Sequence, residues 1–221
     1  MTQLVLPLPH RPALGREDFL VSAANQNAVA WVDRWPDWPN RCLALHGPQG
    51  CGKSHLGEVH RARSGAVRLA ARDLARARIQ SLTHVVIEDG PPDPQGEAAL
   101  FHLINWLRET GGSLLLSGRP PPAEWPVGLP DLASRLKAMT AVAIDRPDDA
   151  LLEAMLVKLF ADRQITIDKA VIDYLLRVME RSFAAVQDIV GRLDEAALAR
   201  QQRITVPLVR RLLRPKQEDA G

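Results

Sequence analysis

The sequence GPQGCGKS at residues 47–54 has the pattern G-x-x-x-x-G-K-S. An apolar run at residues 42–45 precedes it and residues 54–59 can begin a helix, so the pattern falls between an expected strand and an expected helix. In this setting glycines let backbone N–H groups surround a phosphate, the lysine reaches the β- and γ-phosphates, and the serine hydroxyl can bind Mg²⁺. The sequence therefore predicts a site for ADP or ATP with Mg²⁺. The residues predicted to form it are Gly47, Pro48, Gln49, Gly50, Cys51, Gly52, Lys53 and Ser54.

Length and composition are those of a globular protein. The chain has 221 residues, of which 46% are hydrophobic and 24% charged. Its 28 Lys and Arg residues nearly balance 26 Asp and Glu, so the net charge does not indicate a nucleic-acid-binding protein. No long apolar run and no basic-then-apolar amino terminus occurs, which predicts a cytoplasmic protein without a membrane partner. Cys42 and Cys51 are expected to stay reduced, because a disulfide between them would distort the glycine-rich loop.

Further apolar runs follow the loop and predict the rest of a sheet. They occupy residues 66–71, 84–87, 113–116 and 141–144. Each is short and mostly apolar without alternation, which is typical of buried parallel strands. Helices are expected at residues 26–33, 54–63, 71–80 and 95–109. The pattern predicts an α/β nucleotide-binding base at residues 15–146, built on a wound, parallel five-stranded sheet.

After residue 146 the apolar residues recur only at helical spacing. Asp148 or Asp149, Asp168 and Ser182 can each cap a helix, and a short fourth helix is expected from about Thr205 to Leu213. This predicts a small all-helical lid at residues 147–213, followed by a disordered tail at 214–221.

The apolar run at residues 85–87 ends in two acids, Glu88 and Asp89. P-loop NTPases place two such carboxylates beside the nucleotide, one to hold Mg²⁺ and one to orient the attacking water. We therefore predict Ser54 and Glu88 as metal ligands and Asp89 as a catalytic residue. A Glu at the first position is one methylene longer than the usual Asp and less suited to octahedral Mg²⁺.

With both elements in place, the chain resembles the AAA+ ATPases of the bacterial replication-initiator family. It is most similar to the Hda-like members, small homologues of DnaA that lack a DNA-binding domain. Residues 18–21 and 25–28 resemble the segment that packs beside the adenine, which implies that Asn25 contacts the nucleotide. Residues 128–136, GLPDLASRL, resemble the Box VII motif, whose arginine reaches a nucleotide on a neighbouring subunit. The resemblance covers about residues 15–213. It implies that Arg135 is catalytic in trans, that no dedicated DNA-binding domain is present, and that a homo-oligomer is possible.

The amino terminus is similar to the peptide by which Hda-like proteins dock on the sliding clamp, the beta subunit of DNA polymerase. The anchors would be Gln3, Leu4, Leu6, Pro7 and Leu8, within a flexible tail at residues 1–14. Gln3 offers an amide to a polar pocket, the leucines supply apolar anchors, and Pro7 reduces the entropy lost on ordering. The alternative is an apolar tail folded onto its own domain.

Three departures from the family pattern lie around the expected γ-phosphate. Glu88 stands for the first acid, Arg119 stands near an expected aspartate, and Ala184 stands near the expected lid arginine. Arg181 can replace that arginine or be a solvated residue at a helix end. Phosphoryl transfer depends on positioned charge, so these changes predict weak or no intrinsic ATPase activity and a mainly structural nucleotide.

The resemblance implies a clamp-associated negative regulator of replication initiation that promotes hydrolysis of DnaA-bound ATP. Its partners would be the clamp and DnaA. Two alternatives stay open from the sequence. One is an autonomous AAA+ ATPase or loader, and the other is a nucleotide-stabilised adaptor that tethers another protein to the clamp.

Overall fold

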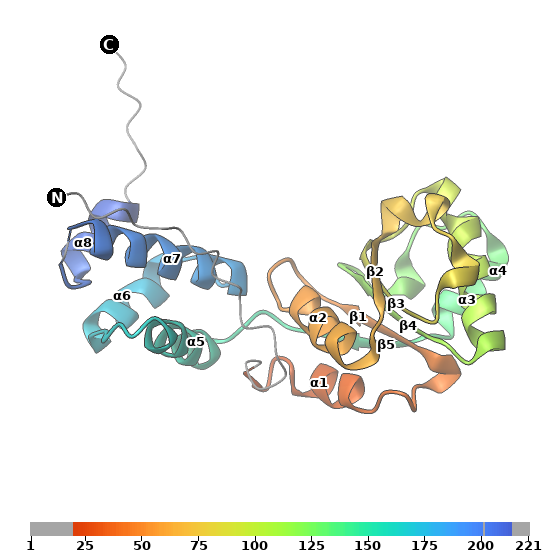
Figure 1. Ribbon diagram of the computed structural model, residues 1–221, viewed down its shortest axis with the longest axis horizontal. Helices are drawn as coiled ribbons and strands as arrows, with labels where there is room; N and C mark the ends of the chain where they lie inside the picture. Colours follow the sequence, from red (N-terminus) through yellow and green to blue (C-terminus); the bar gives the residue numbers. More distant parts are fainter. Residues whose placement is uncertain (1–19, 201, 214–221) are drawn as a thin grey trace, which may run out of the picture.

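The computed structural model describes residues 20–200 and 202–213. It consists of an α/β base and a helical lid, joined by the segment that follows the last strand (Figure 1). The proposed clamp-binding tail at residues 1–14 and the tail at 214–221 lie outside the described residues.

The base is built on five parallel strands, which confirms the predicted sheet. They are β1 (Cys42–His46), β2 (Val67–Ala70), β3 (His84–Gly90), β4 (Ser113–Gly118) and β5 (Thr140–Ala143). Their order is β2-β3-β4-β1-β5, with Ala44 of β1 opposite Leu116 of β4 and Ala141 of β5. The central strands β1, β3 and β4 are almost fully buried, because helices cover both faces of the sheet.

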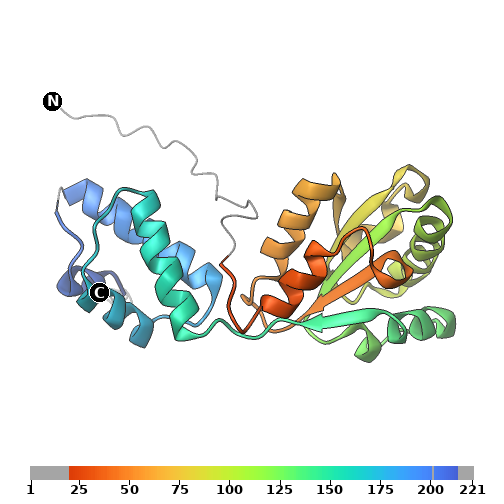
Figure 2. The ribbon, with the colours of Figure 1, turned by 90° about the horizontal axis from the view of Figure 1, so that it is seen from below.

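Successive side chains of each strand enter different cores, as the pleat requires. Leu43 and Leu45 pack with α1 (Gln26–Asp33) and α2 (Lys53–Ser64), whereas Ala44 packs with α3 (Pro94–Thr110) and α4 (Pro130–Lys137). The result is a three-layer arrangement of helices, sheet and helices (Figure 2).

The helix expected at residues 71–80 is wrong. The chain instead forms two short 3₁₀ helices, η3 (Ala71–Arg76) and η4 (Ile79–Ser81), separated by extended backbone at Ala77. In η3 only Ala71 and Leu74 are buried, and this spacing of three residues suits the 3₁₀ period. The segment has too narrow an apolar face to hold an α-helix against the base.

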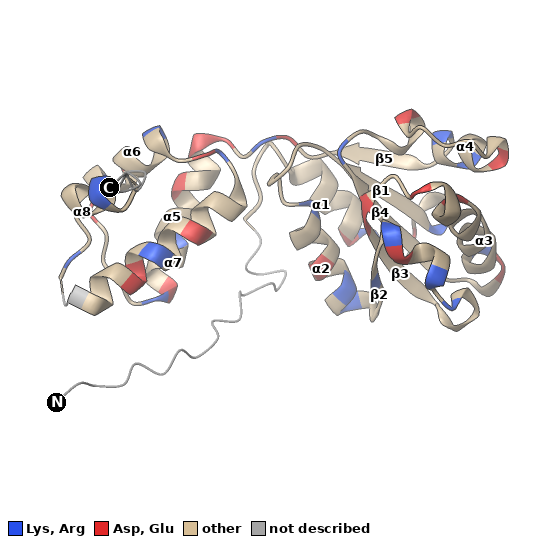
Figure 3. Cartoon of the chain, turned by 90° about the horizontal axis from the view of Figure 1, so that it is seen from above, with Lys and Arg blue, Asp and Glu red and all other residues tan. Residues whose placement is uncertain are grey.

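The lid consists of four helices with a core of their own. They are α5 (Asp149–Asp162), α6 (Lys169–Val178), α7 (Phe183–Arg200) and α8 (Val206–Leu213). The Asp148 carboxylate accepts the Leu151 N–H at 2.7 Å and the Ser182 hydroxyl accepts the Ala185 N–H at 3.1 Å, so two predicted caps are formed. Asp168 precedes α6 without such a side-chain bond. Acidic and basic residues are interspersed along α5 and α7 (Figure 3).

The described helices include none with the length and apolar character needed to cross a membrane.

A buried histidine, His60, lies within the base, in the layer formed by α1 and α2. His60 has 0% exposed surface, and neither ring nitrogen has a hydrogen-bond partner. Its ring packs against Trp38, with centroids 4.8 Å apart, and against Trp35 at 5.7 Å. Burial above all, together with the neighbouring His84 and Arg63, lowers the pKa of His60 to about 4. His60 is therefore neutral in the folded protein at pH 7.

Replacing His60 with Leu is expected to reduce the acid sensitivity of the fold. Between pH 6.5 and about 4 the unfolded chain binds a proton at His60 that the folded chain does not, so stability falls as the pH drops through this window. The shift corresponds to about 3 kcal/mol at its full extent. At pH 7 the variant should be as stable as the parent or more stable, because an unpaired buried polar group is removed.

The measurement is urea unfolding at pH 7, 5.5 and 4.5. His102→Gln, which alters an exposed histidine on α3, serves as the matched control and should keep the pH dependence of the parent. An unchanged pH dependence in His60→Leu would contradict the assignment.

Candidate nucleotide site and the Arg135 face

The glycine-rich loop leaves the carboxyl end of β1 and leads directly into α2, as the sequence predicts. Gly50 and Gly52 have φ angles of 76° and 103°, which other residues adopt only with strain. Lys53 is the first residue of α2, so the free N–H groups of this helix begin at the loop. The local backbone therefore has the form of a phosphate-binding loop at a helix N-terminus.

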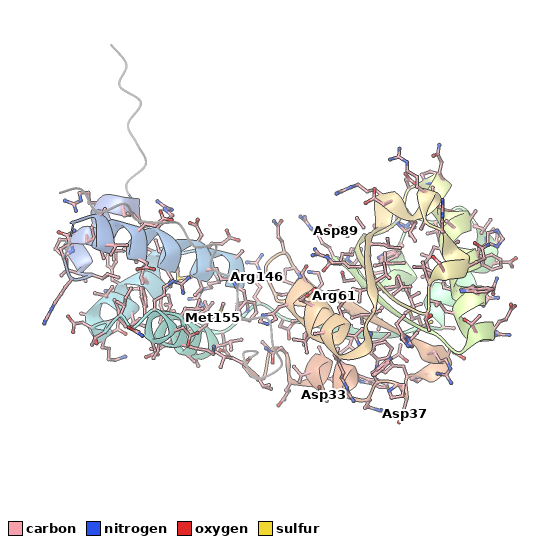
Figure 4. The ribbon with its side chains drawn as sticks, viewed as in Figure 1. Asp33, Asp37, Arg61, Asp89, Arg146 and Met155 are labelled. Atoms are coloured by element: carbon pink, nitrogen blue, oxygen red, sulfur yellow. The ribbon has the colours of Figure 1, made fainter. Side chains whose placement is uncertain are left out.

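A cleft of about 1320 Å³ opens beside this loop, between the base and the lid. Asp89 and Arg61, both labelled in Figure 4, line it from β3 and α2. Of the predicted loop residues, the lining includes Gln49, Gly50, Gly52, Lys53 and Ser54. Phe183, Ala184 and Gln187 line it from α7 of the lid. This volume is large enough for a nucleotide, because pockets for small-molecule ligands usually measure about 300–1,000 Å³.

Backbone carbonyl groups of the loop hold the Lys53 side chain in place. The Nζ atom donates to the carbonyl oxygens of Gly47 at 2.8 Å and Pro48 at 2.7 Å. It also lies 3.6 Å from the sulfur of Cys51, which is buried. The ammonium group is thus held at the loop on which a phosphate would sit.

The two acids at the end of β3 have different surroundings. Glu88 is 5% exposed and forms an ion pair with Arg68 of β2, and it is not among the residues that line the cleft. Asp89 is exposed, has a φ of 60° and does line the cleft. Of the predicted metal ligands, Ser54 therefore lines the cleft and Glu88 does not, whereas Asp89 lines it together with Ser54. The Arg68 partner lies 20 residues away in sequence, so no local pattern indicated it.

Asn25 lies away from the cleft lining. Its side chain is 1% exposed, and its amide donates to the Leu20 carbonyl at 2.9 Å and accepts from the Ser22 N–H at 2.9 Å. The amide thus shapes the chain that precedes α1.

Arg119 lies beside the loop at the end of β4. Its guanidinium donates to the side-chain oxygen of Gln49 at 2.7 Å, and its carbonyl accepts the Gly47 N–H at 3.0 Å. A cation and not an acid therefore occupies this side of the cleft.

The lid contacts the loop directly, a feature that the sequence did not indicate. The N–H of Phe183 donates to the Gly50 carbonyl at 3.1 Å. A Cβ atom at Gly50 would overlap the Cβ of Ser182, and one at Gly52 would lie 3.0 Å from the Phe183 ring. Both glycines are therefore needed for close packing of the lid as well as for their backbone angles.

Arg181 does not replace the missing lid arginine in this arrangement. Its guanidinium pairs with Asp149 at the start of α5, with a nitrogen–oxygen distance of 2.5 Å. Arg181 is not among the residues that line the cleft, whereas Ala184 is. Among the described residues, the lid therefore presents to the cleft an aromatic ring, a methyl group and the Gln187 side chain, and no cation.

Arg135 lies at the other end of the sheet. It lines a small pocket of about 220 Å³ together with Cys42, Arg108 and Met139. Cys42 begins β1 and the phosphate loop follows the end of β1, so the two ends are about 13 Å apart along the strand. The Arg135 guanidinium stacks on the Phe101 ring, 4.9 Å from its centroid. Burial raises the pKa of the Cys42 thiol to about 11, an effect that the Arg135 charge partly offsets.

The strand order, the phosphate loop after β1 and the helical lid define an AAA+ fold of the P-loop NTPase class. Domain III of the Thermotoga maritima replication initiation protein DnaA shares this fold, with a TM-score of 0.79 and 14% identity over 93% of this chain and 98% of that one. AMPPCP-bound DnaA from Aquifex aeolicus has a TM-score of 0.73 and 17% identity, over 86% of this chain and 68% of that one. The Thermotoga maritima RuvB branch migration motor has a TM-score of 0.62 and 14% identity, over 78% and 60%.

A family match adds to this likeness of fold. Residues 148–213 match the family described as Hda, lid domain. This range contains all four lid helices, α5 to α8. The lid match and the DnaA-like fold together support an Hda/DnaA-like AAA+ protein, in agreement with the resemblance found in the sequence.

Proposed function

We propose that this chain regulates DnaA by stimulating hydrolysis of the ATP that DnaA binds, with Arg135 acting in trans. The observation that carries the proposal is the position of Arg135. It lies at the end of β1 opposite to the phosphate loop, too far away to serve the chain's own nucleotide, which supports a role toward a neighbouring subunit. The Hda lid match and the DnaA-like fold support DnaA as that neighbour.

The chain's own cleft is proposed to hold ADP or ATP. Backbone N–H groups of residues 47–54 would surround the phosphates, Lys53 would neutralise them, and Ser54 and Asp89 offer oxygen atoms to Mg²⁺ or its waters. Glu88, the ligand expected from the sequence, would have to leave Arg68 to take part. The AMPPCP bound to Aquifex DnaA supports this assignment.

The surroundings of the cleft favour binding over turnover. An unpaired acid, a lid arginine and a polar sensor are the groups that position charge at a γ-phosphate. In this chain the acid, Glu88, is paired with Arg68. Ala184 stands at the place of the lid arginine, and Arg119 stands at the place of the polar sensor. The nucleotide would then act mainly as a ligand between the base and the lid, which already touch at Gly50 and Phe183.

The reaction itself would take place on DnaA. Water attacks the γ-phosphorus of the DnaA-bound ATP and the bond to the β,γ-bridging oxygen breaks, so that ADP and phosphate are released. The Arg135 guanidinium would stabilise the negative charge that develops on the transferred group, a contribution worth about 10³–10⁵ in rate for arginine fingers supplied in trans.

The amino-terminal peptide is proposed to bring the protein to the DNA-loaded clamp. Holding two partners on one scaffold raises their effective concentration without any new contact between them. The test of the whole proposal is the rate of DnaA-ATP hydrolysis with this protein, with and without DNA-loaded clamp. Stimulation that requires the clamp is expected. Clamp binding without stimulation would favour the adaptor, and turnover by this protein alone at about 1 s⁻¹ or faster would favour an autonomous ATPase.

Clamp docking is expected to depend on Gln3 and Leu4. The double variant Gln3→Ala/Leu4→Ala removes one polar and one apolar anchor and should lose co-elution with the clamp in gel filtration. His10→Ala/Arg11→Ala, in the same segment but outside the peptide, is the control and should co-elute like the parent. If the Gln3/Leu4 variant still co-elutes as well as the parent, the peptide is assigned wrongly.

A further inference from the structure

A buried carboxylate on α3 contacts the start of the helix that carries Arg135. Glu97 is 8% exposed. Its two oxygens accept the N–H of Gly128 at 3.1 and 2.9 Å, and one of them also accepts the N–H of Leu129 at 3.0 Å. Gly128 and Leu129 are the residues immediately before α4.

This contact fixes the backbone that leads into α4, at a helix start that has no side-chain cap of its own. Leu129 occupies the N-cap position and has no side-chain acceptor, and Pro130 follows it. A carboxylate at this end also lies at the positive end of the helix dipole. Among the described residues Glu97 has no salt bridge to a cationic side chain, so these backbone N–H groups are the partners that stabilise its buried charge.

The same helix contacts α4 a second time. Phe101 follows Glu97 by one turn of α3, and its ring lies under the Arg135 guanidinium. Arg135 is six residues after Leu129, about 9 Å further along the axis of α4. Two residues of α3 therefore contact α4 at two places, at the residues just before its first turn and at the Arg135 side chain.

We propose that Glu97 is a positioning residue for Arg135, because its carboxylate sets the start and hence the direction of α4. This inference rests on the proposed role of Arg135 in trans. Glu97 does not touch the partner's nucleotide. It acts through the backbone of Gly128 and Leu129, so its loss should lower the maximal rate more than it weakens binding between the partners.

The test is stimulation of DnaA-ATP hydrolysis by Glu97→Gln, titrated against DnaA in the presence of DNA-loaded clamp. The amide keeps one acceptor oxygen but turns an NH₂ group toward backbone donors. We expect maximal stimulation to fall by about 10–100-fold, since a displacement of about 1 Å in a catalytic group can cost this much, with little change in the half-saturating concentration. Glu109→Gln, an exposed glutamate on the same helix, should behave like the parent.

A second variant and a double variant separate positioning from general damage. Glu97→Asp keeps the charge but withdraws it by one methylene, and it should also lose maximal stimulation; it decides the question if Glu97→Gln does not fold. Adding Glu97→Gln to Arg135→Ala should lower the residual stimulation no further, and ADP binding should be unchanged in every folded variant.

The outcomes distinguish the two proposals. Full stimulation by Arg135→Ala would overturn the proposed function. Loss of stimulation in Arg135→Ala together with parental stimulation by folded Glu97→Gln and Glu97→Asp would overturn the positioning role alone. A further equal loss when Glu97→Gln is added to Arg135→Ala would also overturn it, because a residue that acts through Arg135 cannot have an effect without it.

Discussion

Arg135→Ala is expected to abolish most of the stimulation of DnaA-ATP hydrolysis, by a factor of about 10³–10⁵ if its guanidinium is the sole finger. The lost interaction exists only in the transition state, so the maximal rate should fall rather than the affinity for DnaA. ADP binding should be unaffected, because Arg135 and Lys53 lie at opposite ends of β1. The measurement is release of phosphate from DnaA-ATP in the presence of DNA-loaded clamp.

The environment of Arg135 provides the controls. Its stacking on Phe101 predicts a small loss of stability in Arg135→Ala, about 0.5–1 kcal/mol. Lys137→Ala removes an exposed cation two residues later on α4 and should stimulate like the parent. Arg135→Lys keeps the charge but not the planar fork of donors, and should restore only part of the stimulation. Parental stimulation by Arg135→Ala would exclude this residue as the finger.

Lys53→Ala is expected to weaken ADP binding by about 1.5–3 kcal/mol, the usual value of hydrogen bonds to a charged group, or roughly 10- to 100-fold in Kd. The ammonium group is held at the loop by the carbonyl groups of Gly47 and Pro48, so its removal also loosens the loop itself. Isothermal titration calorimetry with ADP measures the effect.

A matched control uses a lysine of the lid. Lys169→Ala alters a cation that pairs with Asp173 and Glu153 on the lid surface and should leave the ADP affinity unchanged. If Lys53→Ala binds ADP as tightly as the parent, the cleft is not the nucleotide site. This result would leave the Arg135 proposal standing, because the two sites are separate.

Much of the fold was predictable because its signals are local or periodic. A strand buried on both faces must be apolar at successive positions, so the five parallel strands were visible as short apolar runs. The caps at Asp148 and Ser182 involve bonds within three residues, and the phosphate loop is a single contiguous segment. The exception, η3 and η4, had the residue types of a helix but lacked the apolar face that would hold one.

The sites were predictable only where a contiguous motif forms them. The motif located Lys53 and Ser54 at the cleft, but it did not reveal that Glu88 pairs with Arg68, that Arg181 pairs with Asp149, or that Asn25 turns its amide to its own segment. Each of these residues is of a type that suits the expected role. Contacts with residues that are near only in the folded chain give it a different partner.

By itself, the sequence determined the five strands, the phosphate loop and most of the helices in chain order, and it singled out Arg135 as the residue proposed to act on a partner. Tertiary structure decided which charged side chains are already paired, such as Glu88 and Arg181, and which contacts hold the proposed site residues in place. Glu97 meets Gly128 across 31 residues, and Gly50 meets Phe183 across more than a hundred. Such contacts depend on how α3 and α7 pack against the base. The free energy of burying a charge or a backbone N–H group depends on whether a hydrogen-bond partner lies beside it in the packed structure. Residue spacing along the chain therefore does not predict it.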